Sequence, residues 1–396
     1  MLKWLAQVFT VTGFAVRTIP QRKGASLAAA FGIAGVVMVL VSVLSIAFGF
    51  RKTMNVSGAP DRAVVLRMTA DNEMMSFFTG DEVRVIQDAP HLQRSEQGPS
   101  ASPELYVIID LPKRSTGTDA NVPLRGVQPA AFDVHHEITM LQGRRFAPGR
   151  NEIIVGRAAV GEFAGLELSA TLKVVGLPWT VVGVFSANGS VAESEIWTDA
   201  GVLQPAYQRG NTYQSVFVRL ESTDRFNEFK DAFTTDPRLK VKVRRETEYY
   251  ADQSKLLFRL ISFLGGLIAS LMALGAAFGA LNTMYTAVAA RTREIATLRA
   301  LGFGAGPVAI SVLLESILLA VFGGAVGATV AYIAFDGFRT ATLNFQSFSQ
   351  VAFAFEVTPG LLAGGVFLAA FIGFIGGLLP AVRAARMPIA TGLRAW

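Results

Sequence analysis

The chain contains no cysteine and only three histidines. It therefore has no disulfide framework, no thiolate metal site and no cysteine nucleophile, and three histidines leave little room for a histidine-based metal centre. Charged residues are also scarce, at 17%, where ordinary soluble domains carry roughly 25%. Hydrophobic residues make up 51% of the chain. Together these values exclude an ordinary soluble enzyme and indicate membrane spans.

Long apolar runs take the place of the missing charge. A bilayer core takes about 20 apolar residues as a helix, and four runs are long enough: residues 25–50, 259–290, 303–335 and 357–382. We predict an α-helical membrane protein with four transmembrane helices. A large α+β extracytoplasmic domain of two lobes, residues 51–258, is inserted between helices 1 and 2. The first run is too long for the apolar part of a cleaved signal peptide, which is the alternative interpretation.

The charges indicate the orientation of the chain. Only bases precede the first span, and bases dominate residues 291–302 and the tail 383–396. Residues 51–258 have 24 basic and 26 acidic residues, and the short connection 336–356 has one base and two acids. By the positive-inside rule we predict both termini in the cytoplasm, with 51–258 and 336–356 outside. Because the bases flank the spans, the net charge of +6 does not mark a nucleic-acid surface.

Residues 1–24 predict a helix of their own at the cytoplasmic surface. Trp4 stands near the start, and apolar side chains recur at helical spacing: Leu5, Val8, Phe9, Ala15, Val16 and Ile19. Such a segment is typical of an amphipathic helix that lies in the membrane interface. A disordered leader is the alternative.

Residues 51–258 have the pattern of a mixed α and β domain. Short β-branched runs broken by glycine, proline and aspartate predict strands. The predicted strands are 63–68, 82–87, 104–111, 152–155, 172–175, 180–185, 215–220 and 240–244, with a helix at 225–233. The last strand, helix and strand have the size of half a ferredoxin-like layer. An insertion near 120–205 divides this domain into the two predicted lobes.

No catalytic constellation is visible in this domain. His135 and His136 are adjacent, so in a strand they would point to opposite faces and could not easily share a metal. Glu193 and Glu195 could share one face of a strand, but a solvated edge is the favoured interpretation. The glycines near Gly302 lack the lysine and the preceding strand of a phosphate-binding loop. We expect no enzyme activity, no metal and no cofactor on this chain, and any ATP to be hydrolysed by a partner.

Small residues recur one helical turn apart within three of the spans. Such spacing allows helices to pack closely. The pairs are Gly275 and Gly279, Gly323 and Gly327, and Gly373 and Gly377. They favour a compact bundle over isolated anchors.

Glu315 is the one acid inside an otherwise apolar run. An ionisable group in a membrane is costly and is by default a functional candidate. It could pair with a base across a helix interface or help to transmit a movement. With equal weight, the span could begin near Pro307 and leave Glu315 at the inner interface.

One string resembles the FtsX-like permease domain of ABC transporters: Arg291-Thr292-Arg293-Glu294-Ile295-Ala296-Thr297-Leu298-Arg299-Ala300-Leu301-Gly302, followed by Glu315 and the glycines 323, 324 and 327. Residues 380–388 are similar to the carboxy-terminal signature of that family. Upstream, residues 141–146, 152–156 and 182–185 are similar to the MacB-type periplasmic core domain. Together the resemblances cover nearly the whole chain.

The resemblance implies a permease that pairs with a second permease, identical or different, and docks two cytoplasmic ABC ATPase subunits. ATP and Mg²⁺ bind to the ATPase, and its cycle rearranges domains outside the membrane without a continuous pore, which is mechanotransmission. Residues 291–302 are then the coupling helix. The implied coupling residues are Arg291, Arg293, Glu294, Ile295, Leu298, Arg299, Leu301 and Gly302. We expect Arg291, Arg293 and Arg299 to be exposed; the alternative is that these arginines only anchor the topology.

One departure from the family concerns the ATPase. Macrolide exporters carry a fused amino-terminal ATPase, whereas 24 residues precede the first span here, so we expect a separate ATPase chain. Lipoprotein-release permeases share this arrangement. Efflux, preferred here and served by a periplasmic adaptor protein, therefore stands beside lipoprotein release and control of cell-wall hydrolases. The resemblance places the chain in a bacterial inner membrane, in contact with lipid. A membrane-anchored sensor or scaffold without transport is the alternative class.

Overall fold

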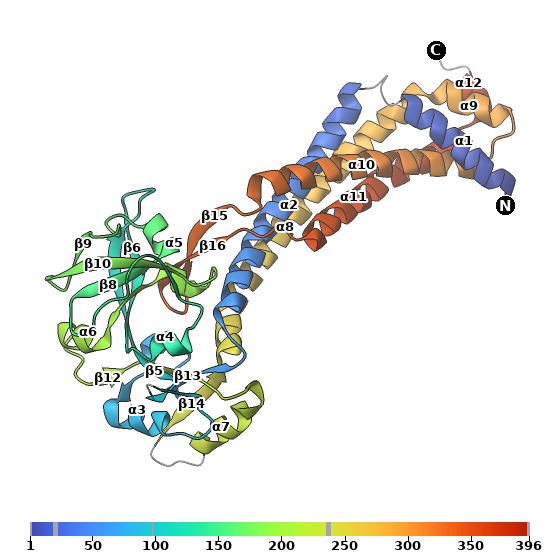
Figure 1. Cartoon of the computed structure of the whole chain (residues 1–396). Helices are drawn as coiled ribbons and strands as arrows, with labels where there is room; N and C mark the ends of the chain where they lie inside the picture. Colours follow the sequence, from blue (N-terminus) through green and yellow to red (C-terminus); the bar gives the residue numbers. More distant parts are fainter. Residues whose placement is uncertain (1, 19–22, 97, 235–238, 394–396) are drawn as a thin grey trace. The chain divides into compact units, whose positions relative to one another are not determined.

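A computed structural model describes residues 2–18, 23–96, 98–234 and 239–393. The chain divides into two compact units (Figure 1). The helical unit comprises Met1–Phe48, Arg259–Phe338 and Phe355–Trp396, and the α/β unit comprises Gly49–Phe258 and Arg339–Ala354. Parts of the predicted segments 1–24 and 383–396, including Ile19, lie outside the described residues.

Four long apolar helices are present, as the sequence predicts: α2 (Lys23–Ser57), α8 (Glu246–Ala290), α10 (Ala305–Phe335) and α11 (Pro359–Arg386). Each is long and apolar enough to cross a membrane. α2 and α8 are longer than the predicted spans, because polar residues end an apolar run without ending a helix. The last turns of α2 and the first turns of α8 belong to the α/β unit.

Three shorter helices belong to the helical unit: α1 (Leu2–Thr18), α9 (Thr292–Ala300) and α12 (Ile389–Leu393). α1 packs against α10, with Val8 and Val11 buried and Phe9 exposed. The amino-terminal segment is therefore helical and uses apolar side chains for packing. Its place in the membrane interface stays a prediction.

Glycines permit the close packing of the long helices. A Cβ atom added at Gly327 would lie 2.2 Å from the carbonyl oxygen of Ala34 on α2. Gly323 meets α2 in the same way, and Gly373 and Gly377 meet α10. The third predicted pair, on α8, has no neighbouring heavy atom within 4 Å among the described residues. Two of the three pairs thus pack helices within the chain.

A ten-stranded sheet forms the centre of the α/β unit. Its β-branched and aliphatic residues suit a sheet that is covered by helices. In spatial order the strands are β14 (Val241–Arg245), β1 (Arg62–Arg67), β13 (Ser215–Arg219), β5 (Ala101–Pro112), β6 (Asp119–Val127), β11 (Ile196–Asp199), β8 (Glu152–Gly156), β10 (Leu177–Ser186) and β7 (Thr139–Gly143), with β9 (Thr171–Val174) beside β10. Two small ladders pair β2 (Phe78–Thr79) with β12 (Thr212–Tyr213) and β3 (Arg94–Ser95) with β4 (Gly98–Pro99).

Three hydrophobic cores form on this sheet among the described residues, and the third surrounds Phe185 and Trp197. The first packs α3 (Gly80–Gln87) and α7 (Phe226–Thr234) onto β1, β13 and β14. The second packs α5 (Arg157–Glu162) and α6 (Ala200–Ala206) onto strands that include β5, β6 and β8, around the fully buried Trp179. One continuous sheet joins all three cores, so the division into two lobes stays an interpretation.

One predicted strand is wrong, because residues 82–87 belong to helix α3. Thr79 Oγ1 accepts a hydrogen bond from the amide of Glu82, and the Glu82 carboxylate accepts one from the amide of Thr79. This reciprocal cap starts a helix. Val83 and Ile86, three residues apart, then face the first core together.

The connection 336–356, predicted as a short loop, contains the hairpin β15 (Arg339–Asn344) and β16 (Ser349–Ala354). The hairpin belongs to the α/β unit. Asn344 Nδ2 donates to Gln253 Oε1 at 2.7 Å, and the amide of Ala352 donates to Ser194 Oγ at 2.9 Å. The two segments that the charges place on one side of the membrane therefore fold together.

We expect the substitution Gly327→Ala to destabilise the protein by about 1–3 kcal/mol, because its methyl group meets a backbone oxygen of α2. Gly279→Ala is the matched control, on an open face of α8 where alanine favours the helix. Thermal unfolding of both purified variants in one detergent measures the difference. Equal unfolding midpoints would contradict the assigned packing.

Candidate functional site

The short helix α9 follows α8 almost directly and ends in a glycine cap. The amides of Gly302 and Phe303 donate to the carbonyl oxygens of Arg299 and Leu298, both at 3.1 Å. Gly302 has a φ of +96°, a left-handed conformation that favours glycine. The predicted site residue Gly302 thus ends the helix and begins the turn into α10.

α9 has a buried side and an exposed side. Ile295 and Ala296 are buried, and α12 packs against this side. Arg293 and Glu294 are exposed, and Leu301 just after the helix is 73% exposed. The predicted coupling residues therefore divide into a set that holds α9 in place and a set that can reach a partner.

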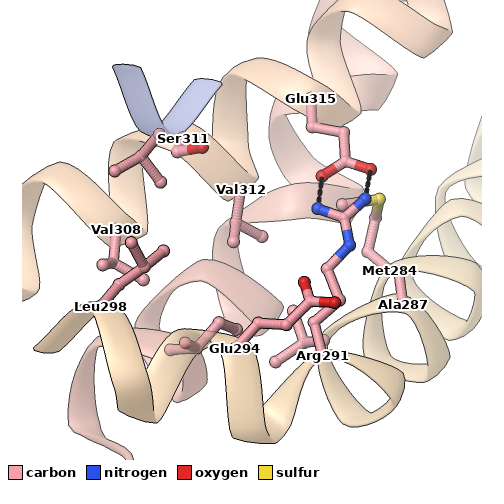
Figure 2. A pocket seen from close by; sticks show the side chains of 12 residues that line it. Met284, Ala287, Arg291, Glu294, Leu298, Val308, Ser311, Val312 and Glu315 are labelled. Atoms are coloured by element: carbon pink, nitrogen blue, oxygen red, sulfur yellow. Dashed lines mark hydrogen bonds and ion pairs between the residues drawn. The ribbon is translucent and has the colours of Figure 1, made fainter. Parts of the chain in front are cut away.

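Arg291 and Glu315 form a two-point ion pair that joins the turn between α8 and α9 to α10 (Figure 2). Arg291 Nη1 lies 3.1 Å from Glu315 Oε2, and Nη2 lies 3.2 Å from Oε1. The two side chains are 13% and 6% exposed. Glu315 thus pairs with a base across a helix interface. The expectation that Arg291 is exposed is wrong, because this pair draws the side chain inward.

A small cavity lies beside this ion pair, between α8, α9 and α10 (Figure 2). Its volume is about 30 Å³, and its walls are mostly apolar, with Met284, Val308 and Val312 among them. Glu294 and Ser311 add polar groups to the lining. Such a volume holds one or two water molecules. The ion pair can therefore be hydrated without separating the helices.

Arg299 is tied to the end of α11. Its Nη1 donates to the carbonyl oxygen of Met387, the residue that caps α11, at 2.5 Å. A cation at this place satisfies a terminal carbonyl and complements the helix dipole. The expected exposure of Arg299 is corrected accordingly: its side chain is half-buried and bonded within the chain.

The α/β unit contains a buried charge cluster centred on Arg125 of β6. Arg125 Nη1 lies 2.7 Å from Glu73 and 2.6 Å from Glu104, and Nε lies 2.7 Å from Glu195. All four side chains are buried. Burial alone lowers the pKa of Arg125, but the charges of Glu195, Glu73 and Glu104 outweigh it and raise the pKa well above its ordinary value. The guanidinium is therefore permanently charged.

Arg62, at the start of β1, extends this cluster. Its Nε lies 2.5 Å from Glu246 Oε2, and its Nη1 lies 2.7 Å from Glu137 Oε2. The amide of Ala59 donates to the same oxygen of Glu246 at 2.9 Å. Ala59 follows α2 and Glu246 begins α8, so the cluster holds both helix ends to β1.

His135 joins the two arginine groups. Its Nε2 lies 3.1 Å from Glu104, and its Nδ1 lies 3.8 Å from Glu137. Burial lowers the pKa of His135, but the bonds to Glu104 and Glu137 outweigh burial and raise the pKa to about 9. We name the set Arg62, Glu73, Glu104, Arg125, His135, Glu137, Glu195 and Glu246 the charge cluster. Sequence reasoning missed it, although single charged residues within apolar strands were its visible signal.

His135 and His136 follow the short helix α4 (Ala131–Val134), and His135 is buried whereas His136 is exposed. The expectation of a solvated edge at Glu193 and Glu195 is wrong. Glu193 and Glu195 are not at a solvated edge, since they are 4% and 2% exposed. Glu193 instead accepts hydrogen bonds from a hydroxyl and from backbone amides. Within the described ranges, acidic and histidine side chains form no group of three that could hold a metal ion.

Two family models match the chain. Residues 26–236, more than half of the chain, match the model described as a MacB-like periplasmic core domain. Residues 266–389 match the model described as an FtsX-like permease C-terminal.

Individual proteins are similar to it as well. The chain is 24% identical over 382 residues to the macrolide export ATP-binding/permease protein MacB of Escherichia coli, covering 88% of this chain and 56% of that protein. It is 24% identical over 239 residues to the uncharacterized ABC transporter permease YknZ of Bacillus subtilis, covering 57% of each. The crystal structure of the periplasmic region of MacB from Actinobacillus actinomycetemcomitans matches at 13% identity and a TM-score of 0.37, covering 48% of this chain and 92% of that chain. The chain spans about half the length of the curated relatives it matches.

We expect Glu315→Gln to destabilise the protein by about 1–3 kcal/mol, because it removes the charge that faces the mostly buried guanidinium of Arg291. Arg291→Gln should lower the stability of the Glu315→Gln variant by less than it lowers the stability of the wild type, because the ion pair is already lost in that variant. Thermal unfolding of the two single variants and the double variant forms the cycle. If the stability losses of the two single variants add up to the loss of the double variant, the two side chains do not interact.

Proposed function

Because the chain belongs to the family of ABC transporter permeases that combine a MacB-like periplasmic core domain with an FtsX-like permease domain, we propose that it is the permease subunit of an ABC exporter. A separate cytoplasmic ATPase binds ATP and Mg²⁺, and α9 docks on it. One observation carries the proposal: α9 is anchored from within by Arg291 and Arg299, while Arg293, Glu294 and Leu301 are exposed.

The exposed side of α9 has the chemistry of a docking surface. Arg293 and Glu294 offer both signs of charge, which fixes the register of a partner and speeds association. Leu301 adds an exposed apolar side chain beside them. The anchors Arg291 and Arg299 lead to α10 and to the end of α11. A force applied to α9 therefore reaches two long helices directly.

The proposed orientation places both termini and α9 in the cytoplasm. The bases flank the spans on that side, in agreement with the positive-inside rule. The fold supports this orientation in one respect: residues 51–258 and the β15–β16 hairpin pack together in one unit. Both connections then lie on the same, periplasmic side of the membrane.

We propose that coupling proceeds by mechanotransmission. α8 is one helix from Glu246 to Ala290, and α2 is one helix from Lys23 to Ser57. A continuous helix keeps its rise per residue, so a displacement at one end moves the other. In the α/β unit Arg62 binds Glu246, the first residue of α8, and Glu246 accepts a hydrogen bond from the amide of Ala59, which follows α2. Motion can thus enter that unit without a pore through the helices.

Export is the task that the relatives favour. Two of them are named macrolide export and pyoverdine export ATP-binding/permease proteins. We propose export of a substrate from the cell envelope by a complex of two permeases, identical or different, and two ATPases, with a periplasmic adaptor protein in the case of efflux. Lipoprotein release and control of cell-wall hydrolases would use the same coupling. A sensor or scaffold would bind no ATPase, which the following experiment tests.

We expect an ABC ATPase encoded beside this gene to co-purify with the tagged chain. Arg293→Glu combined with Glu294→Lys should reduce the retained ATPase at least about tenfold, because opposed charges would face the partner. Arg386→Glu is the control, an exposed arginine on the same unit but outside α9. Retention is measured by ATP turnover per permease after affinity purification.

Two outcomes would contradict the proposal. If the unmodified chain retains no ATPase, the permease function fails and a sensor or scaffold takes its place. If the α9 double variant retains as much ATPase as Arg386→Glu, docking occurs elsewhere on the chain.

A further inference from the structure

A second, smaller cavity lies inside the charge cluster of the α/β unit. Its volume is about 10 Å³, the space that one water molecule occupies. Glu246, Ser190, Arg125 and Trp197 are among the residues that line it. The proposed function makes no use of this cavity.

Two buried oxygen atoms border the cavity without a hydrogen-bond partner among the described residues: Glu246 Oε1 and Ser190 Oγ. Glu246 is 1% exposed and Ser190 is 4% exposed. A buried carboxylate oxygen that accepts no hydrogen bond carries a large desolvation cost. The other oxygen, Oε2, is well satisfied by Arg62 and by the amide of Ala59.

The charges around Glu246 do not balance. The cluster holds three bases and five acids, so two negative charges are in excess when every group is ionised. The charged and titratable groups near this region are the following: Arg62 on β1, Glu73 before β2, Glu104 and Tyr106 on β5, Arg125 on β6, His135 and Glu137 after α4, Glu195 before β11, and Tyr249 and Tyr250 on α8. Arg62 is shared between Glu137 and Glu246, and Arg125 is already shared among three other carboxylates.

We propose that Glu246 is a proton-binding site: the carboxyl group is neutral at pH 7, its hydroxyl on Oε1 points into the cavity, and one water molecule links it to Ser190 Oγ. Protonation removes one of the two excess charges and turns the unsatisfied acceptor into a donor. The water then has the two polar partners that a buried water needs. Oε2 keeps its role as the carbonyl oxygen that accepts from Arg62 and Ala59.

The position of this proton gives it a consequence. Glu246 is the first residue of α8, and Ala59 lies just beyond α2. Loss of the proton would put a second excess charge where both helix ends join β1. The bonds that attach the two helix ends to β1 should therefore weaken as the pH rises. This inference concerns the α/β unit alone and stands whether or not an ATPase binds.

Neighbouring groups set the direction of the pH dependence. The pKa of His135 is raised from 6.5 to about 9, so its contribution to stability is complete below pH 6.5 and is lost as the pH rises through about 9. Ionisation of Glu246 acts in the same direction. Burial raises the pKa of Glu137, but His135 and Arg62 outweigh burial and hold it far below its ordinary value, so this carboxylate loses its contribution only in strong acid. The cluster is therefore most stable at weakly acidic pH and loses stability as the pH rises.

The variant Glu246→Gln tests the proposal, because glutamine has the shape of a neutral carboxyl group and can donate from the Oε1 position. In the full chain in detergent we expect it to unfold at the same or a higher temperature than the wild type at pH 7. The infrared C=O band of a neutral carboxyl group, which shifts in D₂O, should lose intensity in this variant. Glu137→Gln is the matched control, since that carboxylate also faces Arg62. It should lower the unfolding temperature, because it removes a charge that Arg62 holds.

Several results would overturn the proposal. A neutral-carboxyl band that is absent from the wild type, or equally strong in Glu246→Gln, would show that Glu246 is ionised. A Glu246→Gln protein that fails to fold, or that loses as much stability as Glu137→Gln, would show the same, because a neutral isostere of a neutral group must be tolerated.

Discussion

The α/β unit depends on the pairing of buried Arg125 with three glutamates. Glu73, Glu104 and Glu195 come from three separate elements, and each is within 2.7 Å of the same guanidinium. A buried ion pair of this kind costs desolvation energy and is stable only when its groups are fully bonded. Every element that supplies a carboxylate must therefore be in place at once. That requirement fixes the middle of the sheet, between the first and the second hydrophobic core.

α8 is the element that joins this requirement to the rest of the protein, because an arginine binds a glutamate side chain at each of its ends. Arg62 holds Glu246, its first residue, within the α/β unit. Arg291, directly after its last residue, holds Glu315 within the helical unit. Between them lie apolar turns whose faces make few specific bonds. A helix that is bonded at both ends and makes few specific bonds between them suits the transfer of movement, which is the role proposed for this permease.

The sequence predicts what is local and misses what is assembled from distant residues. Four apolar runs of this length predict membrane helices, and a long helix is present at each of them. The charged string at 291–302 includes the short helix α9, between α8 and α10. The charge cluster was not predictable, because Arg62 and Glu246 are 184 residues apart. In the sequence, a single charged residue within a strand does not reveal whether its side chain is solvated or forms an ion pair. For the same reason Arg291 and Arg299, which have the composition of exposed contacts, turned out to be internal anchors.

The central claim, that ATP binding inside the cell moves the domain outside, can be measured directly. The chain has no native cysteine, so cysteines introduced at the exposed Lys173 of the α/β unit and the exposed Ala325 of α10 can carry spin labels before the ATPase is added. Pulsed dipolar spectroscopy in lipid nanodiscs then gives the distance between the labels. The account predicts that the distance distribution shifts when a non-hydrolysable ATP analogue binds and returns when it is removed. An unchanged distribution in a complex that binds the nucleotide would contradict it.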